Sequence, residues 1–189
     1  MERALVTARM FAKDIGGSGQ DLGDLGDLRI LLSVVPGATN RGWLGYCTVV
    51  LFPMENGWGL FDTGHHSVRH LLLFALRTLD IQPNDIRHVV LSHLHFDHSL
   101  NLPLFKNVQV YISHAELDYA RKVSTGEAQD VSIPDFWPAL LENHRVHIVD
   151  DVFRLSPDRD RRRPHGLRLS HTTGHTGPYT AVHAVLPNA

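Results

Sequence analysis

The alternation of apolar and polar residues predicts three short β-strands in the first third of the chain. They cover residues 28–35, 44–52 and 58–61, with a loop at 36–42 and a turn at 54–57. Consecutive strands joined by short connections usually pair with their neighbours. This region is therefore expected to form a β-meander.

Residues 67–79 have the spacing of an amphipathic helix, and Ser67 is expected to cap its start. The apolar face of this helix consists of Val68, Leu71, Leu72, Ala75, Leu76 and Leu79. Further helices are expected to begin near His114 and to cover residues 136–142. Further strands are predicted over residues 88–91, 108–112, 146–155, 166–170 and 179–186. Mixed strands and helices indicate the α/β or α+β class.

No internal repeat or linker divides this pattern, so one domain over residues 28–189 is expected. The preceding residues, 1–27, are expected to be a flexible segment, because their second half is rich in glycine. The length of 189 residues and the mass of 21.2 kDa fit a single core.

Composition and charge narrow the functional classes to which the protein could belong. The formal charge of -2 provides no strongly basic surface for nucleic acid. The one basic run is interrupted by two aspartates and is expected to be a solvated loop: Arg159, Arg161, Arg162 and Arg163. No secretory signal and no apolar stretch of membrane-spanning length is present, so a cytoplasmic protein is expected. The single cysteine, Cys47, is expected to be a buried core thiol.

The chain contains 14 histidines, and three of them lie in one short segment that follows an apolar strand. In that segment His93 and His95 project to the same side of an extended chain, because strand side chains alternate. Asp97 and His98 follow where the chain is expected to turn. Imidazoles with a carboxylate suit zinc, and also iron or manganese.

This segment, Ser-His-Leu-His-Phe-Asp-His, resembles the His-x-His-x-Asp-His motif of the metallo-β-lactamase superfamily. It is most similar to the acyl-homoserine lactonase and glyoxalase II branch. Upstream, Asp62-Thr63-Gly64 resembles the Asp-Thr-Gly strand end of the family. Downstream, the segment around His175 resembles its Gly-His-Thr loop, with Gly177-Pro178 in place of the usual Pro-Gly order. The resemblance covers residues 28–186.

The resemblance implies an αββα sandwich. It assigns His93, His95 and His175 to a first metal ion, and Asp97 and His98 to a second. It also implies that Asp62 accepts a hydrogen bond that orients a metal-bound histidine. Zinc is the expected metal, as one or two ions, with iron or manganese as alternatives.

Two ligands of the family pattern have no counterpart in the sequence. No Gly-Asp strand end follows His175, and His183 lies in a predicted strand with no motif around it. The sandwich is therefore expected to lack its last strands and helix. The second metal site is expected to bind its ion weakly or to be empty. A sheet edge left unpaired in this way is expected to favour self-association.

The implied reaction is hydrolysis of an ester, lactone, thioester or amide bond by a metal-bound hydroxide. The substrate would be a small acyl compound, and Asp97 would orient the nucleophile or move a proton. Trp43, Leu44 and Tyr46 could line an acyl pocket, although a place in the core or at a strand edge is favoured. The alternatives are an inactive metal-binding relative and a non-haem iron oxidoreductase, while the charge argues against a nuclease.

Overall fold

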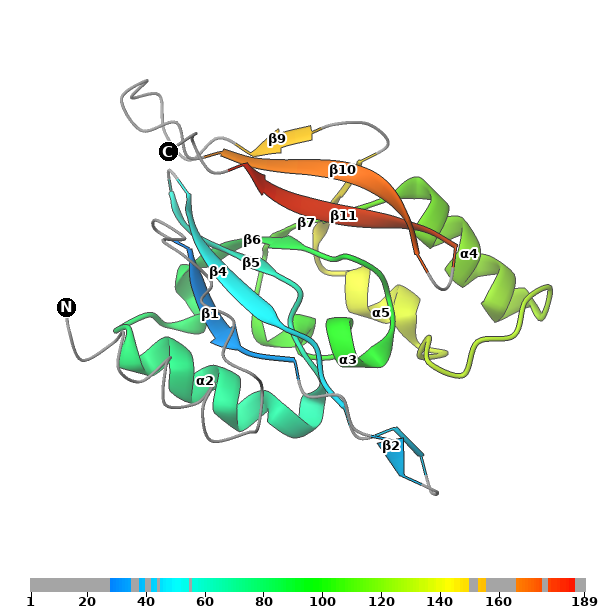
Figure 1. Cartoon of the computed structure of the whole chain (residues 1–189), viewed down its shortest axis with the longest axis horizontal. Helices are drawn as coiled ribbons and strands as arrows, with labels where there is room; N and C mark the ends of the chain where they lie inside the picture. Colours follow the sequence, from blue (N-terminus) through cyan, green and yellow to red (C-terminus); the bar gives the residue numbers. More distant parts are fainter. Residues whose placement is uncertain are drawn as a thin grey trace.

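A six-stranded mixed sheet is at the centre of the protein (Figure 1). The computed structural model describes residues 28–34, 38–39, 42–43, 45–54, 56–149, 153–155, 166–174 and 177–185. The order of the strands in the large sheet is β1-β4-β5-β6-β7-β8. Their bounds are Arg29–Leu32, Val49–Met54, Gly57–Phe61, Ile86–Val90, Gln109–Ile112 and Arg145–Ile148.

The first three strands of the large sheet pair antiparallel, which confirms the predicted meander. From β5 to β8 the pairing is parallel, so the carboxyl ends of these strands lie at one edge. Two smaller sheets contain the other strands of the described residues. One contains β9, β10 and β11, and the other is a two-stranded pairing of β2 with β3; their bounds are Phe153–Leu155, Gly166–Gly174, Gly177–Val185, Ala38–Thr39 and Gly42–Trp43.

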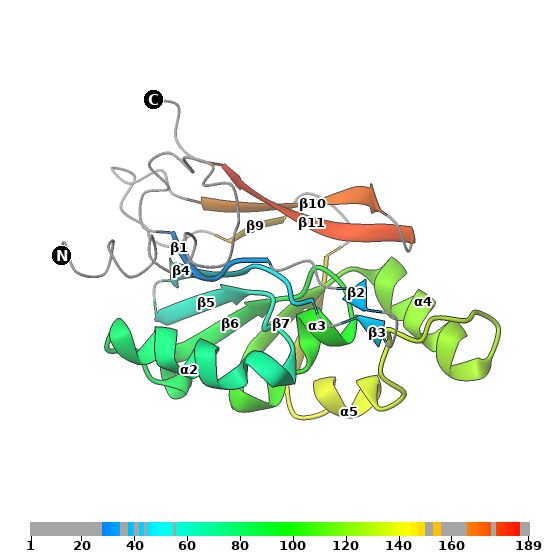
Figure 2. The same cartoon turned by 60° about the horizontal axis from the view of Figure 1, so that its bottom comes forward.

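Helices α2 and α5 lie on one face of the large sheet, and the sheet β9–β11 lies on the other (Figure 2). This layering confirms the predicted α/β class. Among the described residues, no helix has the length and apolar character needed to cross a membrane. The helices are α2 (Arg69–Thr78), α3 (Phe96–Ser99), α4 (His114–Thr125) and α5 (Trp137–Leu141), with short 3-10 turns η1 (His66–Val68), η2 (Pro83–Asp85) and η3 (Leu102–Leu104).

The main core lies between the large sheet and its helices. On the predicted face of α2, Leu72 and Leu76 are fully buried and Val68 nearly so. They pack with strand residues that include Leu60 and Val89. The apolar face of the helix therefore packs against the sheet, as expected.

Several predicted boundaries were wrong. The strand expected over residues 146–155 is two strands, β8 and β9, which belong to different sheets. Continuous apolar character cannot show where a chain leaves one sheet for another. Ser67 is not the cap of α2; His65 precedes η1 and its Nδ1 accepts the Ser67 N–H at 3.2 Å. The strand predicted from residue 44 begins at Val49, and the predicted loop 36–42 contains the short pairing of β2 with β3.

Gly59 lies opposite Phe52 in the pairing of β4 with β5. A Cβ atom at Gly59 would overlap the ring of Phe52, which is 2% exposed. Gly59→Ala is expected to lower the free energy of unfolding by about 2 kcal/mol, because overpacking a closed core forces side chains and backbone apart. Urea denaturation measures the change, and Phe52→Leu in the same chain should recover part of it. Equal stability of Gly59→Ala and wild type would contradict this packing.

Candidate metal centre

The predicted motif lies at the carboxyl end of β6. Leu91 and Leu94 are fully buried and anchor the segment, while α3 carries Asp97 and His98. This arrangement brings three imidazoles together. The ring of His93 lies 4.5 Å from that of His95 and 3.9 Å from that of His98, centroid to centroid. His175 lies outside the described residues, as do residues 1–27, Leu44 and the arginine run.

Asp62 directly follows β5 and lies beside this cluster, in a left-handed backbone conformation with φ of 56°. Its carboxylate is 2% exposed and accepts three hydrogen bonds. Oδ1 accepts the Ser92 N–H at 2.8 Å; Oδ2 accepts the Ser92 hydroxyl at 2.9 Å and Nδ1 of His98 at 2.7 Å. The hydrogen bond that the sequence suggested for Asp62 therefore exists, and a histidine of the motif donates it.

The hydrogen bonds of Asp62 determine which nitrogen of His98 is protonated. A carboxylate only accepts hydrogen bonds, so Nδ1 carries the proton and Nε2 of the neutral ring keeps its lone pair. Nε2 lies 3.6 Å from Oδ2 of Asp97. Burial opposes protonation of His98, but the charge and hydrogen bond of Asp62, and then the charges of Asp97 and Glu116, raise its pKa above the ordinary value.

The hydroxyl of Ser92 links Asp62 to His93 and determines which nitrogen of His93 is protonated. Its hydroxyl donates its only proton to Asp62, so the 2.8 Å contact with Nδ1 of His93 is one in which the imidazole donates. Nε2 of His93 then keeps its lone pair. Asp62 thus orients two histidines, one directly and one through Ser92.

Thr63 and Asn101 hold the Asp-Thr-Gly strand end against α3. The Thr63 N–H and hydroxyl both donate to the carbonyl of His98, at 2.7 and 2.9 Å. The carboxamide of Asn101, which is fully buried, donates to the carbonyls of Thr63 and His65. These contacts explain why the two motifs lie together although more than 30 residues separate them.

Two acidic residues of the site were missed by the sequence analysis. Asp130 follows α4, and its Oδ2 lies 3.0 Å from Nε2 of His95. Glu116 lies in the first turn of α4, where its N–H donates to the capping Ser113 hydroxyl. Its side chain is directed to the motif, and Oε1 accepts the Leu94 N–H at 2.9 Å. Glu116 was recognisable only as a helix-capping residue, and no sequence signal pointed to Asp130.

Burial is the main reason that the pKa of Glu116 is raised from 4.5 to about 7, and the charge of Asp130 adds to it. Because the folded pKa is raised, the contribution of Glu116 to stability is full below pH 4.5 and is lost as the pH rises to about 7.

Glu116→Gln keeps an oxygen for the Leu94 N–H and removes this titration. In metal-free protein, the variant is therefore expected to gain stability relative to wild type between pH 5 and pH 8, by at most about 3 kcal/mol. Urea unfolding across this pH range, with a chelator present, measures the gain. A stability difference that does not change with pH would show that Glu116 ionises normally.

Cys47 is buried as expected, but it lies at the base of the candidate centre. Its Sγ is within 4.8 Å of ligand-capable atoms of both Asp62 and His98. By spacing alone these three groups could hold a metal ion. However, both Asp62 oxygens already accept hydrogen bonds, and burial, then the charges of Asp62 and Asp97, raise the pKa of the thiol. We therefore interpret Cys47 as a neutral packing residue beneath the imidazoles.

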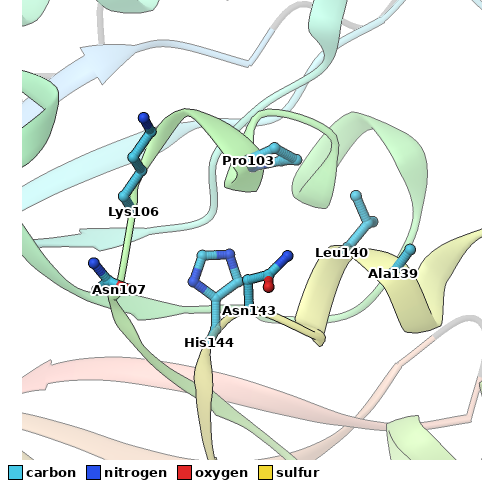
Figure 3. Close-up of a pocket in the computed structure, with 7 residues that line it drawn as sticks. All are labelled: Pro103, Lys106, Asn107, Ala139, Leu140, Asn143 and His144. Carbon is cyan, nitrogen blue, oxygen red and sulfur yellow. The ribbon is translucent and has the colours of Figure 1, made fainter.

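A cavity of about 390 Å³ lies elsewhere (Figure 3). Its polar lining comes from Lys106, Asn107, Asn143 and His144. Asn107 and His144 precede β7 and β8, so this cavity is at the amino ends of the parallel strands, at the edge opposite the motif. It is separate from the candidate metal centre.

Comparison with known proteins identifies the family. The sequence profile of the metallo-beta-lactamase superfamily matches residues 41–185. The chain belongs to this superfamily. The match covers both the Asp-Thr-Gly strand end and the histidine motif, and it confirms the family inferred from those residues.

Among curated members of the superfamily, a "probable metallo-hydrolase" of Methanocaldococcus jannaschii is 37% identical over 60 residues, 32% of this chain and 30% of the relative. An N-acyl homoserine lactonase of a Bacillus species is 28% identical over 101 residues, 53% of this chain and 34% of the relative. The chain thus spans about a third of the length of these relatives.

Solved structures of the superfamily confirm the fold. A protein of Thermotoga maritima described as a metallo-beta-lactamase superposes with a TM-score of 0.68 at 22% identity, over 86% of this chain and 74% of that one. A quorum-quenching N-acyl homoserine lactone lactonase superposes with a TM-score of 0.54 at 21% identity, over 82% of this chain and 62% of that one. At these identities the likeness concerns the fold alone.

Proposed function

We propose that this chain is a metal-dependent hydrolase that cleaves an ester, lactone, thioester or amide bond of a small acyl substrate. One observation carries the proposal: the ring of His93 lies 4.5 Å from that of His95 and 3.9 Å from that of His98, centroid to centroid, and a carboxylate or a hydroxyl hydrogen-bonds to each ring. Of the bonds considered, a lactone is the first to test, because one relative is named as an N-acyl homoserine lactonase.

The donor set fits a zinc-type ion. Neutral imidazoles and a carboxylate are its usual protein ligands, and partners outside the ligand set orient such imidazoles. We propose His93, His95 and His175 as ligands of a first ion, with Asp97 and His98 beside a second position. A bound divalent ion would supply Lewis acidity, which lowers the pKa of water to about 7 and polarises a carbonyl group.

The residues of the chain have separate tasks in this proposal. His93 and His95 would hold the ion at the carboxyl edge of the sheet. Asp97 is partly exposed, with 17% of its side chain accessible, so it can contact substrate or water. We assign it the orientation of the attacking water or the transfer of a proton to the leaving group.

The test measures metal content and turnover on the same protein. Purified chain supplied with zinc is analysed for bound metal, and then incubated with an acyl lactone, a thioester, an ester and an amide. We expect close to one tightly held ion per chain, and hydrolysis of at least one substrate that stops when the metal is chelated. His70→Ala, an exposed histidine of α2, is the control that should keep full activity.

Two results would overturn the proposal. One is full metal loading without turnover of any of the four bond types. The other is iron as the bound metal together with oxygen consumption, which would favour an oxidoreductase.

A further inference from the structure

We infer that Asp130 is a positioning residue whose carboxylate holds the proton of His95 on Nε2 and so reserves Nδ1 for the metal ion. This inference rests on the proposed metal centre. It concerns how the centre is assembled rather than which bond is cleaved.

The geometry of the pair determines the tautomer of His95. Nε2 of His95 lies 3.0 Å from Oδ2 of Asp130, and the two side chains are 10% and 11% exposed. An ionised carboxylate accepts and cannot donate, so the hydrogen between them is on Nε2. A neutral imidazole carries one proton, and only its other nitrogen can then bind a metal. For His95 that nitrogen is Nδ1.

The backbone of the loop after α4 holds the carboxylate of Asp130 in place. Its Oδ1 accepts the Ser132 N–H at 2.9 Å, and its Oδ2 accepts the Tyr119 hydroxyl at 3.2 Å. The carbonyl of Ser132 in turn accepts the Phe96 N–H at 2.8 Å, which ties the same loop to the residue after His95.

The two carboxylates around the centre select opposite nitrogens. Asp62 accepts from Nδ1 of His98, whereas Asp130 accepts from Nε2 of His95. The rings of His93 and His95 lie 4.5 Å apart, centroid to centroid, and are inclined by 71° to each other. Assigning Nε2 of His93 and Nδ1 of His95 to the ion is compatible with both hydrogen-bond sets.

The experiment compares Asp130→Ala and Asp130→Asn with Tyr119→Phe. The control variant removes the neighbouring hydroxyl but keeps the contact between Asp130 and His95. Zinc affinity is measured by competition with a chelator, and the tautomer of His95 by ¹⁵N NMR of the imidazole in metal-free protein. Both measurements are made without substrate.

In wild type we expect the Nε2–H tautomer of His95. Asp130→Ala should mix the tautomers and weaken zinc binding about 10- to 100-fold, the usual effect of removing such an outer partner. Asp130→Asn keeps an accepting oxygen, so it should preserve the tautomer and lose less affinity. Tyr119→Phe should stay within about threefold of wild type, since the carboxylate remains.

Two outcomes would overturn the inference: a wild-type His95 protonated on Nδ1, or an Asp130→Ala variant that binds zinc as tightly as Tyr119→Phe. If Asp130→Ala does not fold, the tautomer of His95 in wild type and the zinc affinity of Asp130→Asn still test the inference. Absence of hydrolysis in wild type would remove the proposed function but leave these zinc and NMR results unaffected.

Discussion

Asp62→Ala is expected to lower the free energy of unfolding by about 3 kcal/mol or more. The substitution leaves the Ser92 N–H, the Ser92 hydroxyl and Nδ1 of His98 without their acceptor in a site where Asp62 is 2% exposed. Each buried donor without a partner costs about 1–3 kcal/mol. Alanine also disfavours the left-handed backbone found at this position, at a cost of about 1–2 kcal/mol.

Asp62→Asn is the matched control, because asparagine tolerates this backbone and keeps one accepting oxygen. It should be destabilised less than the alanine variant, while the pKa of His98 falls because the facing charge is removed. Since Asp62 raises the folded pKa of His98, its contribution is full below the unfolded pKa and is lost as the pH rises through the folded one. The stability gap between wild type and Asp62→Asn should therefore be wider at pH 6 than at pH 9.

Urea unfolding of metal-free protein gives both stabilities, and NMR titration gives the pKa of His98. If Asp62→Ala and Asp62→Asn lose the same free energy of unfolding, neither the accepting oxygen nor tolerance of the left-handed backbone stabilises the protein at this position. A pKa of His98 that is unchanged in Asp62→Asn would contradict the role of the charge.

His93→Ala is expected to abolish metal-dependent hydrolysis, with a loss of about 1,000-fold or more. The Lewis acidity of a bound ion contributes several kcal/mol to a transition state, and 1.36 kcal/mol corresponds to a factor of ten in rate. His93 is 6% exposed and contacts both other imidazoles of the cluster. The substitution would therefore remove a proposed metal ligand and the packing partner of the other two rings.

Initial hydrolysis rates and bound zinc are measured together for His93→Ala and for His70→Ala. The first variant should lose both zinc and turnover, whereas the second should retain both. Circular dichroism checks that each variant is folded. A folded His93→Ala protein that keeps its zinc and its rate would show that the metal, if one acts, binds elsewhere.

Local sequence determined the candidate ligands and the strand ends that carry them. His93 and His95 are two residues apart in an extended segment, so the chain itself places them on one side. The buried residues Leu91 and Leu94 fix which side faces the core. The Asp-Thr-Gly strand end was recognised by its resemblance to the family motif. The α/β class was predicted from periodicity. The strand predicted over residues 146–155, however, is two strands in different sheets.

The partners of those ligands depended on the tertiary structure. Glu116 reaches Leu94 across 22 residues, Ser92 reaches Asp62 across 30, and Asp130 reaches His95 across 35. No periodicity links such positions. They meet because β5, β6 and β7 are parallel, so that the segments after their carboxyl ends, including α4 and its following loop, gather at one edge of the sheet. The sequence thus identified the side chains that could bind a metal, and the hydrogen bonds of the fold decide which ring nitrogen of His93, His95 and His98 carries the proton.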